Sequence, residues 1–442
     1  MTLALENFDR PLNRQDGKTL VLAALGGALE FYDFVIFVFF AAVIGQLFFP
    51  PGLADWLKEL QSYGIFAAGY LARPLGGIVM AHFGDLMGRK RMFTLSVFLM
   101  AVPTFAIGLL PTYTTLGVVA PILLLVLRLL RGAAIGGEIP GAWVFVAEHA
   151  PARRVGLACG SLTSGLTFGI LLGSLVATGI HAWFGADEIA AYAWRLPFLI
   201  GGVFGLLAVY LRRWLEETPV FEAMRREKKL AEGLPLSVVL RGHVRAVVVA
   251  MLVTWILTAA IVVVILMTPT LLQTHYHLPA DQVLIASCLA SFCLSIGVIL
   301  AGLAVDRFGV GPTLGIGSIL LAGMTYLLYF VAATSPDWLL PIYALTGLTV
   351  GTVGVVPIIL VRSFPPAIRF SGISVSYNIA YAVFGGLTPV VITLMIQSGL
   401  PDAPSLYVGL LCLLGLILAV SGLHRVGSRR QGGRLAMGSA AD

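Results

Sequence analysis

Charged side chains are scarce in this chain: Asp, Glu, Lys and Arg make up 11% of its 442 residues, whereas 58% are hydrophobic. Soluble domains have about 25% charged residues. The mean hydropathy of +0.95 is too high for the buried core of a soluble protein of this length. The composition therefore excludes a soluble fold and indicates an integral membrane protein whose surroundings are a lipid bilayer.

Cysteine and catalytic motifs are also lacking. The four cysteines lie in apolar segments without the spacing of metal ligands, so we interpret them as packing residues and expect no metal site. Neither an HExxH nor a GxSxG motif is present, and no soluble output domain is recognisable. We therefore expect neither an enzyme nor a sensor. A cleavable signal peptide is not expected either, because the amino terminus is polar and the first apolar run is too long.

Long apolar runs dominate what is present. Most of them are long enough for a helix to cross a hydrocarbon core of about 30 Å. The runs cover approximately residues 19–47, 60–83, 92–111, 117–148, 155–183, 194–211, 244–274, 282–304, 312–333, 338–361, 370–398 and 404–424. We predict an all-α membrane protein with twelve transmembrane helices in two pseudo-symmetric bundles of six.

Positive charges alternate between the two sides of this predicted arrangement. The two terminal segments and the loops on their side hold 23 of the 28 Lys and Arg, if Arg245 at the edge of its span is included. The positive-inside rule therefore predicts a multi-pass protein of the bacterial inner membrane with both termini in the cytoplasm. The basic pI near 9.2 follows from this topology, so we expect no nucleic-acid partner.

The two predicted bundles share a motif. Asp85 and Gly88 in GDLMGRKR correspond to Asp306 and Gly309 in VDRFGVGP, 221 positions later. Duplication of six helices is typical of secondary transporters, which bind substrate at the repeat interface near the bilayer midplane. We divide the chain into an amino-terminal bundle, a cytoplasmic linker, a carboxy-terminal bundle and a cytoplasmic tail, at residues 1–212, 213–243, 244–426 and 427–442.

Six ionisable residues interrupt the apolar spans, although a charge at the bilayer centre costs about 2.5–3.5 kcal/mol on insertion scales. They are Glu30, Asp33, Arg73, Arg128, Arg131 and Glu138. Spacings of three place the two acids of the first span on one helix face and the two arginines of the fourth span on another. We expect the acids to face the arginines around a central cavity. Alternatively, these residues form ion pairs that only fix helix packing.

Motifs along nearly the whole chain resemble the major facilitator superfamily, and within it the metabolite–proton symporter branch. The matching segments are ALEFYDF, ARPLGG, GDLMGRKR, RLLRGAAIGGEIPGA, AWRLPFLIGG, LRRWLEETPVF and FGGLTP. The branch includes bacterial carriers for citrate, α-ketoglutarate, shikimate and proline/betaine. The resemblance implies a monomer that imports a small molecule with protons by alternating access and needs no cofactor besides the proton gradient.

The resemblance also implies roles for the buried charges. Asp33, which follows Tyr32, would carry the proton and pair with Arg128 of RLLRG; Glu30 is the second candidate. An arginine partner keeps a buried carboxylate ionised, whereas loss of that partner favours protonation. Arg131 stands where the branch has glutamine. Arg131 adds a second guanidinium group beside that of Arg128. This favours an anionic substrate, because guanidinium binds carboxylate bidentately. Alternatively, Arg131 only neutralises an acid, Glu30 or Glu138.

Two further sets of residues complete the predicted machinery. The substrate site is expected to contain Arg128, Arg131, Glu138, Tyr32, Trp255, Tyr377, Asn378 and Tyr381, although the aromatic members could equally pack or face lipid. By resemblance, the cytoplasmic gate is expected to contain Asp85, Gly88, Arg89, Glu148, Asp306 and Arg362. Arg362 departs from the branch, which has an acid at that position. Alternatively, the Arg and Lys residues of GDLMGRKR serve membrane orientation alone.

Three substrate classes remain open. We expect first a proton symporter for a di- or tricarboxylate. An efflux antiporter for a toxic anion or drug has the same fold, but span five lacks the glycine–proline motif typical of drug antiporters. A symporter for a zwitterionic osmolyte such as betaine or proline is the third alternative; such relatives often have a long coiled-coil tail, whereas this tail is short.

Overall fold

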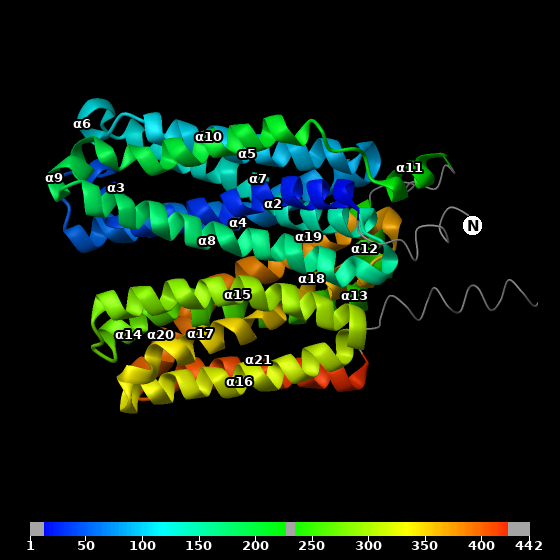
Figure 1. Cartoon of the computed structure of the whole chain (residues 1–442). Coiled ribbons are helices and arrows are strands. Elements are labelled where there is room, and N and C mark those ends of the chain that lie inside the picture. The colour runs from blue at the N-terminus through cyan, green and yellow to red at the C-terminus, as the bar shows by residue number, and fades with distance from the viewer. Residues whose placement is uncertain (1–12, 227–234, 423–442) are drawn as a thin grey trace, which may run out of the picture. The chain divides into compact units, whose positions relative to one another are not determined.

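The computed structural model describes residues 13–226 and 235–422, which contain helices and no strands (Figure 1). The first half consists of α2 (Arg14–Phe39), α3 (Ala41–Phe48), α4 (Asp55–Met87), α5 (Arg89–Leu109), α6 (Tyr113–Leu116), α7 (Val119–His149), η1 (Ala152–Arg154), α8 (Val155–Trp183), α9 (Ala186–Glu188), η2 (Ile189–Ala193) and α10 (Arg195–Arg212). Two short helices follow, α11 (Pro219–Arg226) and α12 (Pro235–Gly242).

Helices continue through the second half. They are α13 (Val244–Ala259), η3 (Ala260–Met267), α14 (Thr268–Thr274), α15 (Ala280–Phe308), α16 (Val310–Thr334), η4 (Pro336–Trp338), α17 (Leu339–Val350), η5 (Gly351–Val355), α18 (Val356–Ser363), η6 (Pro366–Ile368), α19 (Arg369–Ala380), η7 (Tyr381–Gly385), α20 (Gly386–Gln397) and α21 (Ala403–Ser421). In the described part of the chain, eleven helical stretches are long and apolar enough to cross a membrane. With α4, they confirm the prediction of an all-α fold of twelve spans.

The chain forms two compact units. The amino-terminal unit comprises Val21–Ala142 and Gly165–Glu217, and the carboxy-terminal unit comprises Met1–Leu20, Trp143–Ser164 and Thr218–Asp442. Within the amino-terminal unit α5 packs along α10, and within the carboxy-terminal unit α15 packs along α17 and α16 along α21 (Figure 1). The last turns of α7 and the first turns of α8 thus belong to the carboxy-terminal unit. The division at residues 212 and 244 stays a prediction.

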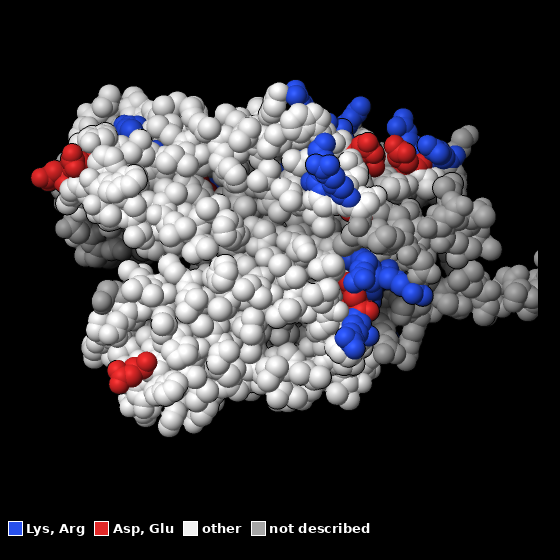
Figure 2. All heavy atoms as spheres, in the orientation of Figure 1, with Lys and Arg blue, Asp and Glu red and all other residues white. Residues whose placement is uncertain are grey.

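The outer sides of the helices suit a lipid environment. Leu71, Leu75 and Val79 of α4 follow one helix face and are 70%, 71% and 52% exposed. Figure 2 shows long helix surfaces without charged side chains, and Lys, Arg, Asp and Glu near helix ends. A helix satisfies its own backbone hydrogen bonds, so apolar side chains can face hydrocarbon without cost to the main chain.

Glycines bring two pairs of helices into backbone contact. On α7, a Cβ at Gly132 or Gly136 would overlap the backbone of α4 at Gly69 or Arg73. On α8, a Cβ at Gly169 or Gly173 would overlap the backbone of α2 at Ala28 or Tyr32, and one at Gly165 would overlap the side chain of Ala24. Small residues at four-residue spacing allow such close packing in membranes. These glycines therefore serve close packing of the helices.

The duplicated motif forms equivalent turns. Gly88 joins α4 to α5 with φ 120°, and Gly309 joins α15 to α16 with φ 88°. Both values lie in the left-handed region, which glycine adopts without the steric penalty of a Cβ. Each half therefore uses glycine to reverse the chain immediately after the second span.

Candidate functional site

Asp33 lies at the centre of a buried polar cluster in the amino-terminal unit. Its Oδ2 is 2.7 Å from Nη1 of Arg128 and 2.9 Å from Nη1 of Arg131. The hydroxyl of Thr104 on α5 lies 3.2 Å from Oδ1 and accepts a hydrogen bond from Nε of Arg131 at 3.1 Å. One carboxylate thus serves two guanidinium groups. The predicted pairing of the acid in α2 with the arginine that begins RLLRG is present.

Glu30 forms the second acidic position of the cluster. Its Oε1 is 3.1 Å from Nη1 of Arg73 on α4. Arg131 donates through Nη2 to the main-chain carbonyl of Glu30 at 3.3 Å. The other carboxylate oxygen, Oε2, is buried and has no hydrogen-bond partner among the described residues. Arg131 therefore pairs with Asp33 and touches the backbone of Glu30, whereas the alternative was that it neutralises Glu30 or Glu138.

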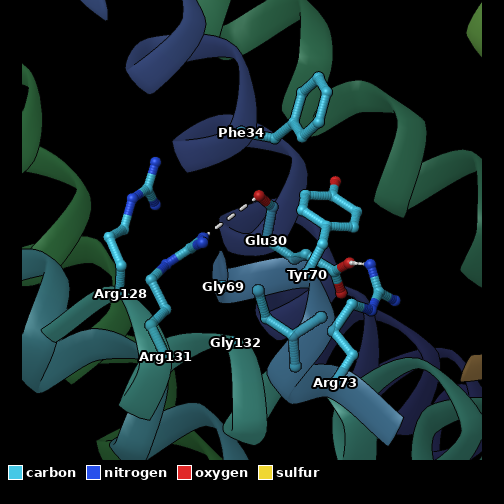
Figure 3. Close-up of a pocket in the computed structure, with 9 residues that line it drawn as sticks. Glu30, Phe34, Gly69, Tyr70, Arg73, Arg128, Arg131 and Gly132 are labelled. Carbon is cyan, nitrogen blue, oxygen red and sulfur yellow. Dashed lines mark hydrogen bonds and ion pairs between the residues drawn. The ribbon is translucent and has the colours of Figure 1, made fainter. Parts of the chain in front are cut away.

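We call Glu30, Asp33, Arg73, Arg128 and Arg131 the cavity cluster, because four of them line a small cavity (Figure 3). Figure 3 shows the guanidinium groups of Arg128 and Arg131 on one side of Glu30 and that of Arg73 on the other. The volume open to the centre of a water molecule is about 20 Å³, which is enough for about one water. Three cations face two anions, so the cluster carries one excess positive charge.

Aromatic rings complete the cavity cluster. The guanidinium carbon of Arg128 lies 3.5 Å from the ring centroid of Phe37, and that of Arg73 lies 5.3 Å from the centroid of Tyr70. Cation–π contacts of this kind stabilise a cation more strongly where water is excluded. Tyr70 also packs edge-on against Phe34, with ring centroids 6.0 Å apart. The arginines are thereby held by π faces as well as by carboxylates.

A second buried ion pair lies in the same unit. Glu138 on α7 lies 2.6 Å from Nη2 of Arg212 at the end of α10, and the hydroxyl of Ser96 donates to Oε2 of Glu138 at 2.5 Å. Arg212 also donates to the carbonyls of Leu22 (3.3 Å), Ala23 (3.0 Å) and Phe93 (2.6 Å). We call Glu138, Arg212 and Ser96 the staple cluster, since it joins α2, α5, α7 and α10.

The staple cluster changes the interpretation of Glu138. This residue was expected to bind substrate, but both of its carboxylate oxygens are occupied by Arg212 and Ser96, and it is absent from the lining of the cavity. Sequence reasoning missed Arg212 because it stands one position beyond the predicted sixth span. An arginine directly at the end of an apolar run was the available signal.

Tyr32 is held away from the cavity cluster. Its hydroxyl donates to the carbonyl of Pro197 at 2.8 Å, and its ring lies where a Cβ at Gly201 would be. Tyr32 therefore attaches α2 to α10. Its predicted contact with substrate has no support in this arrangement.

The predicted residues of the carboxy-terminal unit form an aromatic network. The ring of Trp255 stacks on Phe384 with centroids 4.1 Å apart, and its Nε1 donates to the hydroxyl of Tyr407 at 2.8 Å. Tyr377 packs edge-on against Trp143 and at 5.4 Å from Tyr381. A separate polar contact is made by Asn378, which donates to the carbonyl of Ser374 at 2.9 Å.

Irregular helix accompanies this aromatic network. The seventh span becomes a π-helix over Ala260–Met267 and the eleventh over Tyr381–Gly385. Segments of π-helix inside α-helices are frequent at functional sites. Every buried charged side chain in the described residues lies at or before position 212. Among the described residues, buried charge is therefore confined to the first half of the chain.

The predicted gate residues fall into separate contacts. Asp85 lies 3.7 Å from Arg89 across the turn at Gly88. In the carboxy-terminal unit, Asp306 accepts hydrogen bonds from the backbone N–H groups of residues 156 and 157, at the start of α8. Glu148 pairs with Arg369 at 2.8 Å.

Further observations concern Glu148 and Arg362. The hydroxyl of Thr218 donates to Glu148 at 2.8 Å, which attaches the start of the linker helix α11 to the end of α7. Arg362, at the end of α18, is exposed. Within the described ranges no cluster of His, Cys, Asp and Glu is arranged to bind a metal ion.

The chain is similar to known transporters along nearly its entire length. Residues 23–296 match the Major Facilitator Superfamily. A putative proline/betaine transporter of Staphylococcus aureus (strain COL) is 32% identical over 430 residues, covering 95% of this chain and 90% of that relative. The proline/betaine transporter of Salmonella typhimurium (strain LT2) is 30% identical, covering 91% and 83%.

Two further similarities concern a relative and the fold. The glycine betaine/proline/ectoine/pipecolic acid transporter OusA of Dickeya dadantii is 31% identical, covering 90% of this chain and 82% of OusA. The proton:xylose symporter XylE bound to 6-bromo-6-deoxy-D-glucose superposes with a TM-score of 0.77 at 18% identity, covering 92% of this chain and 96% of XylE. The latter is a similarity of fold.

Proposed function

Because the chain belongs to the Major Facilitator Superfamily, we propose that it imports a small zwitterionic solute, such as proline or betaine, together with protons. The chain is a multi-pass membrane protein and a secondary transporter, not an enzyme. The relatives, which are proline and betaine transporters, favour the zwitterion alternative over the di- or tricarboxylate expected first. Import, and the cytoplasmic location of both termini, belong to the same proposal.

The observation that carries the proposal is the sharing of Asp33 between Arg128 and Arg131. A substrate carboxylate is the same chemical group as the Asp33 side chain, so it can replace Asp33 on these guanidiniums. Displaced Asp33 would be a buried carboxylate without its cation, a state that favours protonation. Binding of a proton to Asp33 and of a carboxylate to the arginines therefore support each other.

Charge balance gives the order of events in this proposal. Protonation of Asp33 raises the excess positive charge of the cavity cluster from one to two, and a buried charge without a partner is costly. The substrate carboxylate then neutralises one of these charges. Release of substrate returns Arg128 and Arg131 to Asp33, which expels the proton. Each transport cycle would move at least one proton with each carboxylate.

The test uses purified full-length protein in liposomes containing a pH-sensitive dye. Under an inward proton gradient, external proline or betaine should acidify the lumen and labelled substrate should accumulate. Arg131→Gln should raise the KM for substrate about 10- to 150-fold, in line with loss of one charge-assisted hydrogen bond of about 1.5–3 kcal/mol.

Other outcomes would contradict the proposal. Acidification with citrate or succinate but not with proline or betaine would assign the carrier to the carboxylates expected first. The excess positive charge of the cavity cluster is the feature that would then explain it. Alkalinisation of the lumen when substrate is added outside would identify an antiporter.

A further inference from the structure

The starting point is the Oε2 atom of Glu30. The side chain of Glu30 is 5% exposed and uses Oε1 for Arg73, whereas Oε2 has no hydrogen-bond partner among the described residues. Glu30 also lines the cavity of Figure 3. A buried acceptor without a donor costs about 1–3 kcal/mol, and more if the group is charged. The cavity therefore presents an acceptor that suits an N–H donor or a cation.

The cavity surface next to Glu30 is aromatic. Phe34 stands one helical turn beyond Glu30 on α2, and Tyr70 reaches the cavity from α4 (Figure 3). Arg73 lies over the ring of Tyr70, so this ring already interacts with a cation. Aromatic faces attract quaternary ammonium groups, which cannot donate hydrogen bonds. Carboxylate and rings together offer both kinds of contact that substituted ammonium groups use.

The other side of the cavity has the opposite preference. Arg128 and Arg131 face it from α7 and carry the excess positive charge of the cavity cluster. Positions 30 and 33 of α2 are neighbours on one helix face, with Cβ atoms about 5–6 Å apart. In proline and betaine one carbon atom separates the nitrogen from the carboxylate. The spacing of anionic and cationic groups in the cluster is thus comparable with the size of such a zwitterion.

We propose that Glu30, Phe34 and Tyr70 form the subsite for the cationic end of a zwitterionic substrate, whose carboxylate binds Arg131 and Arg128. This proposal rests on the proposed function and adds the basis of selectivity. A carboxylate neutralises one positive charge whether or not the molecule also contains a nitrogen, so the arginines do not distinguish proline from a simple acid. Glu30 supplies the distinction. In this conformation the cavity has room for about one water, so the partly buried rings of Phe34 and Tyr70 move apart when substrate enters.

The test pairs a protein variant with a substrate that lacks the group in question. Cyclopentanecarboxylate has the ring and carboxylate of proline but no nitrogen. In liposomes containing the full-length wild type, it should inhibit proline uptake at least about tenfold more weakly than proline itself. In Glu30→Gln the KM for proline should rise about tenfold, while the inhibition constant of cyclopentanecarboxylate changes less than about twofold. Glu222→Gln, which removes an exposed acid from α11, is the matched control and should change neither value.

A second variant separates ring contacts from hydrogen bonding. Phe34→Leu should raise the KM for betaine more than the KM for proline. The trimethylammonium group of betaine depends on cation–π contact, whereas the proline nitrogen also donates to Glu30. This comparison does not require Glu30→Gln to fold. An equal rise in KM for both substrates would contradict the proposal that Phe34 and Tyr70 belong to the subsite.

Three results would overturn the assignment of Glu30. One is cyclopentanecarboxylate inhibiting the wild type as strongly as proline. Another is an equal rise, in Glu30→Gln, of the KM for proline and of the inhibition constant of cyclopentanecarboxylate. The last is Glu30→Gln losing substrate-induced proton movement at unchanged KM, which would make Glu30 a proton carrier. Failure of the wild type to transport any zwitterion would instead refute the proposed function.

Discussion

The cavity cluster and the staple cluster use the same kinds of residue in the same unit, yet their hydrogen bonding differs. In the staple cluster both oxygens of Glu138 are bonded, and Arg212 bonds Glu138 and three backbone carbonyls. In the cavity cluster Asp33 is shared by two arginines, and one oxygen of Glu30 has no hydrogen-bond partner among the described residues.

This difference separates a structural ion pair from a site poised for exchange. The charged residues of both clusters are buried, so burial alone does not identify function. A saturated pair has no donor or acceptor left for a ligand. A shared carboxylate beside a cavity can release one partner and accept another. The number of partners for each oxygen is therefore the informative quantity.

The largest effect on transport is expected at the shared carboxylate. Asp33→Asn keeps the size and hydrogen-bonding capacity of the side chain but removes its titration. Uptake driven by a proton gradient should fall about 100-fold, equivalent to about 2.7 kcal/mol, and the remaining uptake should no longer depend on external pH. Substrate exchange without a gradient should persist. Gradient-driven accumulation at the wild-type level in this variant would show that Asp33 does not couple protons.

The next prediction concerns stability. It tests whether the staple cluster is a structural ion pair without a role in transport. Arg212→Ala leaves Glu138 buried without its cation and should destabilise the fold by about 3–5 kcal/mol. Replacing both residues by apolar ones, Arg212→Met with Glu138→Leu, should recover most of that loss. Thermal unfolding in detergent measures both changes. Restored stability with absent transport in the double variant would mean that the staple cluster also serves the transport cycle.

The smallest effects are expected at two matched hydroxyl groups on α5. Thr104 lies 3.2 Å from Asp33, and Ser96 donates to Glu138 at 2.5 Å. Thr104→Val should shift the pH dependence of uptake with little change in unfolding temperature. Ser96→Ala should lower stability by about 1–2 kcal/mol and leave the pH profile unchanged. Exchange of these two results between the variants would reverse the roles assigned to the clusters.

Much of the site was predictable from local sequence, because charges inside apolar spans are rare. Spacing alone placed Glu30 with Asp33 and Arg128 with Arg131, and resemblance paired Asp33 with Arg128. The partner of Glu30 could not be predicted, since Arg73 lies in another span and only tertiary packing brings α4 to α2.

The remaining differences come from tertiary contacts that one sequence does not contain. Tyr32 is adjacent to Asp33 in sequence but turns its hydroxyl toward Pro197. Arg212 was counted with the loop charges, because an arginine directly at the end of an apolar run is also the usual position of a charge that sets membrane orientation. The irregular helix over Ala260–Met267 contains no proline, so its sequence did not indicate the irregularity.

The glycine contacts have a mechanical consequence. Arg73, Arg128 and Arg131 belong to α4 and α7, whose backbones touch, while Glu30 and Asp33 belong to α2, whose backbone touches α8. The bases are thus mounted on one rigid frame and the acids on another. The staple cluster joins α2 to α7 through Arg212, so α2 can move against α4 and α7 at the cavity cluster only by turning about that junction. Such a movement would lengthen all three acid–base contacts together. The cluster then responds as a single latch, open or closed, instead of as three independent bonds.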